Sequence, residues 1–460
     1  MVKKGGVPLR LSKNIFCITT VFTIMFLVSI SDVISDFAFA EDKVLSLDDC
    51  LKIGLESNPK LKSANFMVDS AQEDINAAKA DFLPSVSAGA NYNNIVSVDS
   101  SGREDLDYID QQNTNYNIGV SQVLYAGKRL VNSRDRAIER RKMFLEEKAY
   151  TQAELIYQIK FVYFQLMKAK QDVQVGVDTV KRLEADVAAA RAFYEKEMAP
   201  YAQVLQAEVD LADARQELSK INNTVDRKKS ELFVLMNQPF NSDTTFSGTL
   251  DYYPKGFNMT SKQCLEQAVA HRPDLRSLSH QITMTEKDMK IAEGKYHPML
   301  RLNAGYYDQD KDYDMSNSSD QRNTYWSAGV NLSWSLFDGG RGWYEKRRSQ
   351  IDMKRIKEQV KDIKSRLEAG IVTALMSLSE AEGRIQATAE SVKASKEYYD
   401  MENKRFQAGI ATIASVLDAQ VRVTRADGSY NQALLDYQLA RAELDFWTAE
   451  GVEDTARNAE

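Results

Sequence analysis

Residues 326–336 read WSAGVNLSWSL, so apolar and polar side chains alternate at every step. A period of two places the apolar side chains on one face of a β-strand and the Ser, Gly and Asn residues on the other. The stretch is as long as a tilted strand must be to cross a bilayer, and its polar face carries small uncharged residues. We therefore predict a strand between lipid and a wet lumen, in preference to a strand of a soluble β-sandwich.

Three more stretches of the chain show the same alternation. They are residues 86–98, 114–124 and 300–307, and in each of them the even-numbered positions are the more apolar. Tyr and Trp recur towards the ends of these stretches, where the membrane–water interface favours them. We expect the even faces to contact lipid, at positions that include Tyr92, Val120, Val330, Leu332 and Trp334.

The two halves of the chain are related by a tandem duplication. Identical residues recur at one fixed offset of 214, and the pairs include Cys50/Cys264, Pro59/Pro273 and Pro84/Pro298. Such self-similarity is unlikely by chance and indicates one structural unit written twice. We expect a first repeat over residues 41–250 and a second over residues 251–460.

Most of each repeat has a helical composition, rich in Ala, Glu, Lys, Gln and Leu. In each repeat we expect a short helix, a β-hairpin, a long helix and a further helix. The expected ranges are 86–124 and 300–336 for the hairpins, 128–194 and 342–406 for the long helices, and 201–236 and 413–448 for the helices that follow. Each long helix would reach ~100 Å, so the two shorter helices of a repeat could pair along the whole of it as a coiled coil.

Four strands are too few to close a membrane barrel, and an open edge in lipid leaves backbone groups unsatisfied. The missing strands must come from other copies of the chain, as a shared barrel of eight, twelve or sixteen strands. The fold class is therefore mixed, a membrane β-barrel joined to a long α-helical coiled-coil barrel. Helices of ~100 Å must project far out of the membrane.

Residues 1–40 have the features of a secretory signal peptide. Four basic residues precede an apolar run, Ile15–Ile30, and Ala38-Phe39-Ala40 ends the segment. The alternative is an N-terminal membrane anchor, for which the apolar run is short. The mature chain would then act outside the cytoplasm. The net charge of −7 argues against a nucleic-acid binder.

Several motifs together resemble the TolC-like outer-membrane efflux family. They are Asn58-Pro59-Lys60-Leu61, Phe82-Leu83-Pro84, Leu336-Phe337-Asp338-Gly339-Gly340, Arg405-Phe406-Gln407-Ala408-Gly409 and Val416-Leu417-Asp418-Ala419. The resemblance implies a homotrimer with a twelve-stranded barrel in the outer membrane and a helical tunnel across the periplasm. It implies the exit duct of a tripartite efflux or type I secretion system, which docks on a periplasmic adaptor protein and an inner-membrane transporter.

The resemblance also implies where the functional residues lie. The helix turns at 195–202 and 407–414 would be the periplasmic tips, with Glu197, Pro200, Gly409 and Ala411 as adaptor-docking positions. The acidic positions that line the family's periplasmic aperture fall on Ser415 and Asp418, so only one carboxylate is kept here. The simpler interpretation of Asp418 is a solvated acid near a helix N-terminus, where the helix dipole favours it.

No sequence motif indicates an enzyme, a cofactor site or a metal site. His271, His280 and His297 have no metal-ligand spacing, and the acidic stretch that begins at Asp308 lacks the Gly and Glu of an EF-hand, so we expect a solvated loop there. We also expect no disulfide between Cys50 and Cys264.

The main alternative function is a soluble periplasmic coiled-coil scaffold or adaptor whose strands form a small globular domain.

Overall fold

The computed structural model describes residues 44–99, 107–252, 259–313 and 321–449. Two compact units are distinguished. In the smaller unit, β1 (Val44–Leu45) pairs in parallel with β4 (Thr245–Phe246), and the Ser247 amide donates to the Leu45 carbonyl over 2.9 Å. The larger unit holds the long helices and a four-stranded sheet, described below by itself. The expected signal peptide, residues 1–40, lies outside the described residues.

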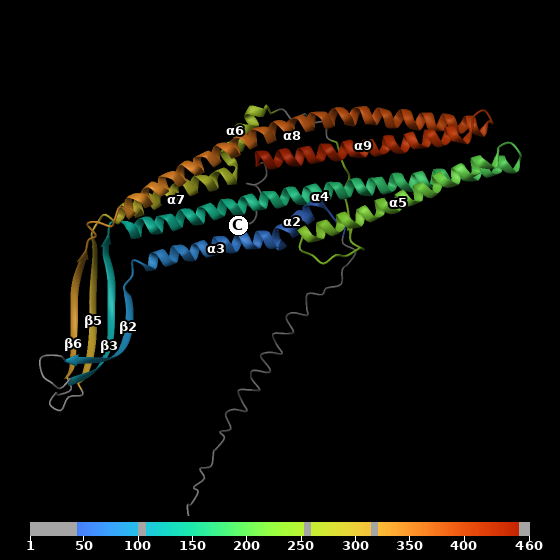
Figure 1. The fold of residues 1–460 in the computed structure, drawn as a ribbon. Coiled ribbons are helices and arrows are strands. Elements are labelled where there is room, and N and C mark those ends of the chain that lie inside the picture. Colours follow the sequence, from blue (N-terminus) through green and yellow to red (C-terminus); the bar gives the residue numbers. More distant parts are fainter. Residues whose placement is uncertain (1–43, 100–106, 253–258, 314–320, 450–460) are drawn as a thin grey trace, which may run out of the picture. The chain divides into compact units, whose positions relative to one another are not determined.

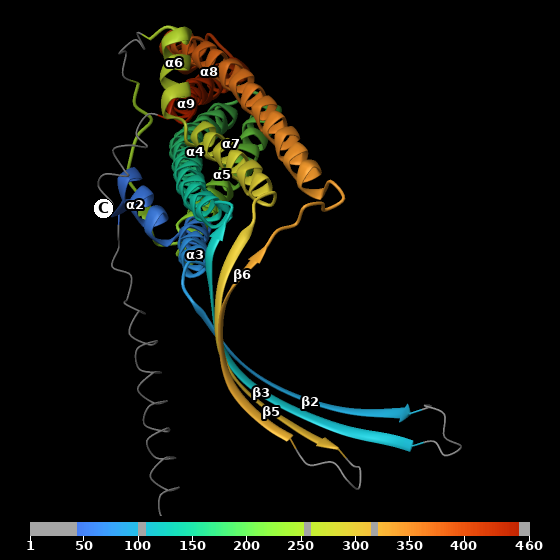
Figure 2. The same ribbon diagram turned by 90° about the vertical axis from the view of Figure 1, so that its left-hand side faces the viewer.

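The sheet consists of β2 (Ser85–Asp99), β3 (Asp107–Ala126), β5 (Met299–Tyr313) and β6 (Gln321–Ser333). Its order is β2-β3-β5-β6 and every neighbouring pair is antiparallel, so the hairpins of the two repeats join through the β3–β5 pair (Figure 1). The strands of both hairpins therefore form one continuous sheet, and Figure 2 shows them side by side below the helices.

Two details of the sheet differ from the sequence expectation. The second hairpin was expected to run to residue 336, but β6 ends at Ser333, and the indole of Trp334 donates to the carbonyl of Tyr296 over 2.9 Å. In β3 the register shifts between Val123 and Tyr125, so Tyr125 lies opposite Leu300. Leu124 is the extra residue of this irregularity, and strict alternation could not reveal it.

Each repeat has two short helices before its hairpin, where the sequence pattern indicated one. They are α2 (Leu47–Ser57) and α3 (Pro59–Ala80) in the first repeat, and α6 (Ser261–His271) and α7 (Pro273–Gly294) in the second. A proline stands at the first position of α3 and of α7, where its missing amide costs nothing. The residue before each proline is extended, which separates the two helices.

The hairpins lead into the long helices α4 (Arg129–Glu195) and α8 (Arg341–Gln407), each of 67 residues. These are followed by α5 (Tyr201–Leu235) and α9 (Ile413–Thr448). The helix α4 packs against α3 and α5 of its own repeat and also against α7 and α9, whereas α8 packs against α7 and α9. In each repeat the two shorter helices thus lie along one long partner, and α4 joins the two repeats.

Most of the buried side chains of these helices are apolar. Cys50 and Cys264 are both fully buried among these helices and no disulfide joins them. Burial raises the pKa of the Cys50 thiol to about 12, with a smaller contribution from Asp49.

Within the described residues, no helix combines the length and the apolar character that crossing a membrane requires.

Candidate functional site

The two turns that end the long helices have the same backbone geometry. In the first, the Met198 amide donates to the Phe193 carbonyl; in the second, the Ile410 amide donates to the Arg405 carbonyl, each over 2.9 Å. Such a bond closes a helix when one residue adopts a left-handed conformation, as in the Schellman motif. Glu197, with φ of 57°, and Gly409, with φ of 73°, take this role.

The residues expected to form the tips lie at or beside these turns (Figure 1). Glu197, Pro200 and Gly409 are exposed, and Ala411 is half-buried with its amide 3.3 Å from the Arg405 carbonyl. Pro200 is extended immediately before α5, which suits a residue whose φ is fixed. Both turns lie at the end of the helices that is remote from the sheet.

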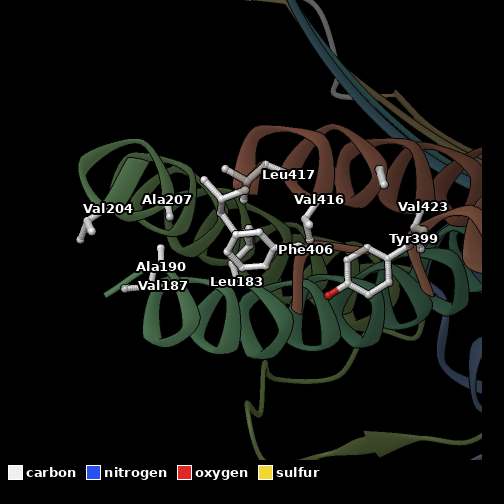
Figure 3. Packing of buried hydrophobic residues seen from close by; sticks show 12 residues of the cluster. Leu183, Val187, Ala190, Val204, Ala207, Tyr399, Phe406, Val416, Leu417 and Val423 are labelled. Atoms are coloured by element: carbon white, nitrogen blue, oxygen red, sulfur yellow. The ribbon is translucent and has the colours of Figure 1, made fainter. Parts of the chain in front are cut away.

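One hydrophobic cluster holds the two turns together. It takes side chains from α4, α5, α8 and α9, and Figure 3 shows ten of them labelled: Leu183, Val187, Ala190, Val204, Ala207, Tyr399, Phe406, Val416, Leu417 and Val423. Phe193 of α4 packs on this cluster, and its ring centre lies 4.7 Å from that of Phe406 of α8. The tips of the two repeats are therefore tied to each other inside one chain by apolar packing.

Ser415 and Asp418 lie in the first turns of α9, with Val416, Leu417 and Ala419 buried on its other side. The Asp418 side chain is 56% exposed and its Oδ2 accepts a hydrogen bond from Nε of Arg422 over 2.9 Å. The Ser415 hydroxyl donates to the Thr412 carbonyl over 2.7 Å. The Asp418 carboxylate raises the pKa of Arg422. The negative charge of Asp418 therefore always has the positive charge of Arg422 beside it.

Sequence reasoning missed a buried carboxyl close to the tips. Asp186 of α4 is 4% exposed and its Oδ2 has no hydrogen-bond partner among the described residues. Burial raises its pKa to about 6, although the nearby Arg182 guanidinium acts in the opposite direction. The signal was present in the sequence, because Asp186 shares the buried face of α4 with Leu183, Val187 and Ala190 at helical spacing.

Arg182, which acts on the Asp186 charge, is itself hydrogen-bonded to a polar group on α9. Arg182 donates from Nη1 to the Gln420 side-chain oxygen over 3.2 Å, and Gln420 donates to the Thr424 hydroxyl over 3.1 Å. The Asp186 carboxylate in turn raises the pKa of Tyr399, although burial of that phenol is the larger cause. This polar group lies inside the bundle, where α4, α8 and α9 meet.

The strand register places most of the apolar side chains of the four strands on one face of the sheet. The opposed pairs include Val86/Val120, Val120/Ala304, Leu302/Val330 and Leu300/Leu332. Tyr92, Val120, Val330 and Leu332 are all exposed on this face. Trp334 is also exposed, but it lies just beyond the end of β6. The other face is lined by Asn, Ser and Gly, and the Ser121 hydroxyl donates to the Asn303 side chain over 2.9 Å.

The acidic stretch that begins at Asp308 is not a loop at its start. Asp308 lies within β5, opposite Thr324, and pairs through both carboxylate oxygens with the guanidinium of Arg322. In the described part of the chain, no group of His, Cys, Asp and Glu side chains is arranged to hold a metal ion. His280 instead lies 2.7 Å from the carboxylate of Glu139.

A family model for outer membrane efflux proteins matches the chain twice, over residues 51–238 and 264–450. The two matches correspond to the two halves of the chain that share one order of elements. The chain belongs to the outer membrane efflux protein family.

Relatives of the outer membrane efflux family cover nearly the whole chain. The outer membrane protein TolC of Vibrio cholerae serotype O1 is 22% identical over 398 residues, which are 85% of this chain and 87% of TolC. The pyoverdine export outer membrane protein OpmQ of Pseudomonas aeruginosa is 21% identical over 405 residues, which are 86% of this chain and 82% of OpmQ.

Solved structures show the same fold. The Campylobacter jejuni CmeC outer membrane channel superposes with a TM-score of 0.74 at 14% identity, and the alignment covers 90% of this chain and 88% of CmeC. The open state of the Neisseria gonorrhoeae MtrE outer membrane channel has a TM-score of 0.71 at 18% identity, with coverages of 88% and 89%.

Family membership identifies the chain as an outer membrane efflux protein, as the sequence resemblance implied. The family consists of channel and transport proteins. The alternative of a soluble periplasmic scaffold or adaptor is not favoured.

Proposed function

We propose that three copies of this chain assemble into one exit duct, with a shared twelve-stranded barrel in the outer membrane. The observation that carries the proposal is the sheet order β2-β3-β5-β6, in which β2 and β6 are edge strands and one face is apolar. A sheet with an apolar face in lipid must have no free edge. Each edge must therefore pair with a strand of another copy.

The strand directions allow this closure. Successive strands in the sheet alternate in direction, so β2 and β6 run antiparallel to each other. The β6 strand of one copy can then pair with the β2 strand of the next in the same antiparallel pattern as the rest of the sheet. A barrel of three copies would have an even number of strands, as bacterial outer-membrane barrels do. Tyr92, Val120, Val330 and Leu332 would face lipid, with Trp334 at its boundary.

The helices supply the periplasmic part of the duct. We infer that residues 1–40 are removed on export, and that residues 41–250 and 251–460 contribute equivalent helix pairs to one tunnel. The tips around Glu197, Pro200, Gly409 and Ala411 would contact a periplasmic adaptor protein, and an inner-membrane transporter would deliver substrate to the duct. Asp418 and Ser415 would line its periplasmic aperture. The family's description as efflux proteins and the relative named for pyoverdine export support this direction of transport.

Disulfide cross-linking between copies tests the closure directly. In a background with Cys50 and Cys264 changed to Ser, one cysteine would be placed at Ser327 of β6 and the second scanned along residues 85–93 of β2. We expect covalent dimers and trimers at positions of one parity only, and a trimer by native mass spectrometry in detergent. A protein that stays monomeric while its hairpins remain paired would refute the shared barrel.

Contact with the adaptor at the tips requires a separate experiment. A photo-reactive amino acid at Glu197 should form a cross-link to a periplasmic adaptor in cells. The same amino acid at Glu368, near the middle of α8 and remote from the tips, should not. Equal cross-linking from both positions would contradict docking at the tips.

A further inference from the structure

The helices next to the sheet follow the order of the strands. The helices α3 and α7 precede the strands β2 and β5, and the helices α4 and α8 follow the strands β3 and β6. Because α3 packs on α4, α4 on α7 and α7 on α8, the helix order α3-α4-α7-α8 corresponds to the strand order β2-β3-β5-β6 (Figure 1). The helices α3 and α8 are therefore at the two edges, as are the strands β2 and β6.

One face of the edge helix α8 is left uncovered by the described part of the chain. Glu345 and Lys346 form ion pairs with α7 and so belong to the covered side. Arg347 and Arg348 are exposed, and Ile351, one turn further on, is 58% exposed. Arg348 lies 3.9 Å from a carboxylate of α8 itself. The uncovered face of α8 is thus basic with an apolar side chain beside the two cations.

The other edge helix, α3, has an uncovered face of complementary character. Phe66 is 70% exposed, and Glu73 is exposed and accepts a hydrogen bond from Asn76 of the same helix over 3.2 Å. The next residue, Asp74, is half-buried and pairs with Arg140 of α4 over 2.9 Å. The uncovered face of α3 is thus acidic with a phenyl ring one to two turns before the acids.

The α4–α7 interface inside the chain shows which positions of the edge helices correspond. Three side-chain pairs join these two helices over 2.9, 2.6 and 2.7 Å: Asp135–Lys287, Arg136–Asp288 and Glu139–His280. The helices α4 and α8 begin at Arg129 and Arg341, an offset of 212, and α3 and α7 begin at Pro59 and Pro273, an offset of 214. The same three positions on the edge helices are Arg347–Glu73, Arg348–Asp74 and Ile351–Phe66.

These three matching pairs are chemically complementary, although two of them differ in kind from the pairs inside the chain. Arg347 would face Glu73, which is an ion pair with its charges reversed relative to the α4–α7 interface. Ile351 would face Phe66, so an apolar pair takes the place of a carboxylate and an imidazole. Opposite charges attract, and mutual burial of two exposed apolar side chains stabilises association. Both members of each pair have thus changed together.

We propose that the uncovered face of α8 docks on α3 of the next copy through these three pairs, and that their charges select α3 over α7 as the partner. The inference rests on the proposed shared barrel, because the copy whose β2 pairs with β6 brings its α3 beside this α8. The ring of helices then alternates between α4–α7 interfaces within copies and α8–α3 interfaces between copies.

The reversed charges disfavour the two exchanged pairings. If α7 of another copy docked on α8, Lys287 would lie opposite Arg347. If α3 docked in the place of α7 on α4, Glu73 would lie opposite Asp135. Each exchange brings like charges together, and such repulsion is a means by which an interface rejects a wrong partner. The charges therefore specify which of two similar helices joins neighbouring copies.

Cross-linking between copies tests the α8–α3 interface. Ser63 and Gln359 occupy the positions of Ser277 and Glu147, whose side chains hydrogen-bond over 3.4 Å across the α4–α7 interface. In the Cys-to-Ser background used for the barrel, Ser63→Cys/Gln359→Cys should give covalent dimers and trimers with a short bifunctional thiol reagent.

Charge exchange tests the selection of α3. Arg347→Glu should reduce the yield of cross-linked product at limiting reagent roughly ten-fold, because an attraction becomes a repulsion. Adding Glu73→Arg to this variant should restore the yield. A double exchange that fails to restore it, or an Arg347→Glu variant that links as well as the parent, would overturn the proposed selection.

Lys357→Glu is the matched control for this charge exchange. Lys357 is an exposed base about 15 Å further along α8 than Arg347. Its counterpart in the first repeat, Leu145, remains 37% exposed although α4 is covered by both α3 and α7. The Lys357 position therefore faces away from the interface, and its substitution should leave the yield unchanged. An equal fall in both variants would reduce the effect to net charge and refute the pairing.

The β6–β2 cross-links through Ser327→Cys separate failure of this inference from failure of the proposed function. Those links, without any from Ser63→Cys/Gln359→Cys, would refute the helix interface alone. Absence of both kinds of link would refute the shared barrel. Covalent dimers from Gln359→Cys as a single variant would show that two α8 faces meet, and would overturn α3 as the partner.

Discussion

The Asp418 carboxylate and the Arg422 guanidinium form an ion pair on α9, with 2.9 Å between Oδ2 and Nε. A ring of Asp418 residues at the proposed aperture is therefore accompanied by a ring of cations one helical turn away. The electrostatic character of the aperture depends on both residues, and substitutions of the two should act in opposite directions.

Removing Asp418 should leave Arg422 uncompensated and make the channel less selective for cations. Asp418→Ala should reduce cation selectivity and divalent-cation block in single-channel recordings, whereas Arg422→Ala should increase both, since a ring of bare carboxylates attracts cations. Asp436→Ala is the matched control, because Asp436 also pairs with an arginine, Arg384, but lies far along α9. If both substitutions near the tip leave selectivity and block unchanged, Asp418 does not line the aperture.

The two tip turns should respond oppositely to exchange of their left-handed residues. Glu197→Gly should raise the free energy of unfolding by about 1 kcal/mol, because Gly adopts positive φ without steric cost. Gly409→Ala should lower it by about the same amount, since an added Cβ at Gly409 meets no atom within 4 Å and only the backbone conformation is affected. Thermal or denaturant unfolding of the detergent-solubilised protein would measure both. Changes of the same sign would contradict the equivalence of the turns.

A charge on the apolar face of the sheet should disturb assembly more than one on the polar face. Val330→Arg should cost roughly 2–4 kcal/mol near the bilayer midplane. Ser327→Arg is the control on the polar face. Asn331 lies on that face too, but it is opposite Arg301 in the register, so a second guanidinium there would add repulsion. The yield of heat-modifiable assembled protein reports the effect. Comparable yields from the two variants would mean that the apolar face of the sheet does not contact lipid.

Asp186 should make stability depend on pH. Its pKa is raised from 3.8 to about 6 in the folded chain, so the folded state holds this proton more tightly than the unfolded state does. Stability should therefore fall as pH rises from about 4 to about 6, and the full loss of about 3 kcal/mol persists above that range. Asp186→Asn should remove this loss at pH 7 and change little at pH 4. Unfolding free energies of both proteins across this range measure it.

Asp178→Asn, two turns earlier on α4, provides the control for that experiment. Asp178 is half-buried and accepts a hydrogen bond from Gln174 over 3.2 Å. Its substitution makes the same carboxyl-to-amide change on the same helix, outside the buried cluster of Asp186. A wild-type curve that is flat between pH 4 and 6 would show that the Asp186 carboxyl is solvated in the assembled protein.

The periodic features of this fold could be predicted from the sequence, because period two and helical composition are local properties. The 67-residue helices begin and end within one residue of the expected positions for this reason. The irregularity at Leu124 and the early end of β6 depend on contacts with β5 and with Tyr296, between α7 and β5, which no local pattern contains. Arg422 could have been recognised as the partner of Asp418 from their spacing of four residues. The lack of a hydrogen-bond partner for Oδ2 of Asp186 could not be predicted, because it depends on how three helices pack together.

The β3–β5 pairing has a consequence for the kinetics of assembly. Because one chain carries both hairpins, the seam between them forms as an intramolecular event whose rate does not depend on concentration. Only the β6–β2 seam requires an encounter between chains. In the proposed trimer, six hairpins are brought together by the meeting of three molecules, so the duplication lowers the molecularity of barrel formation by half.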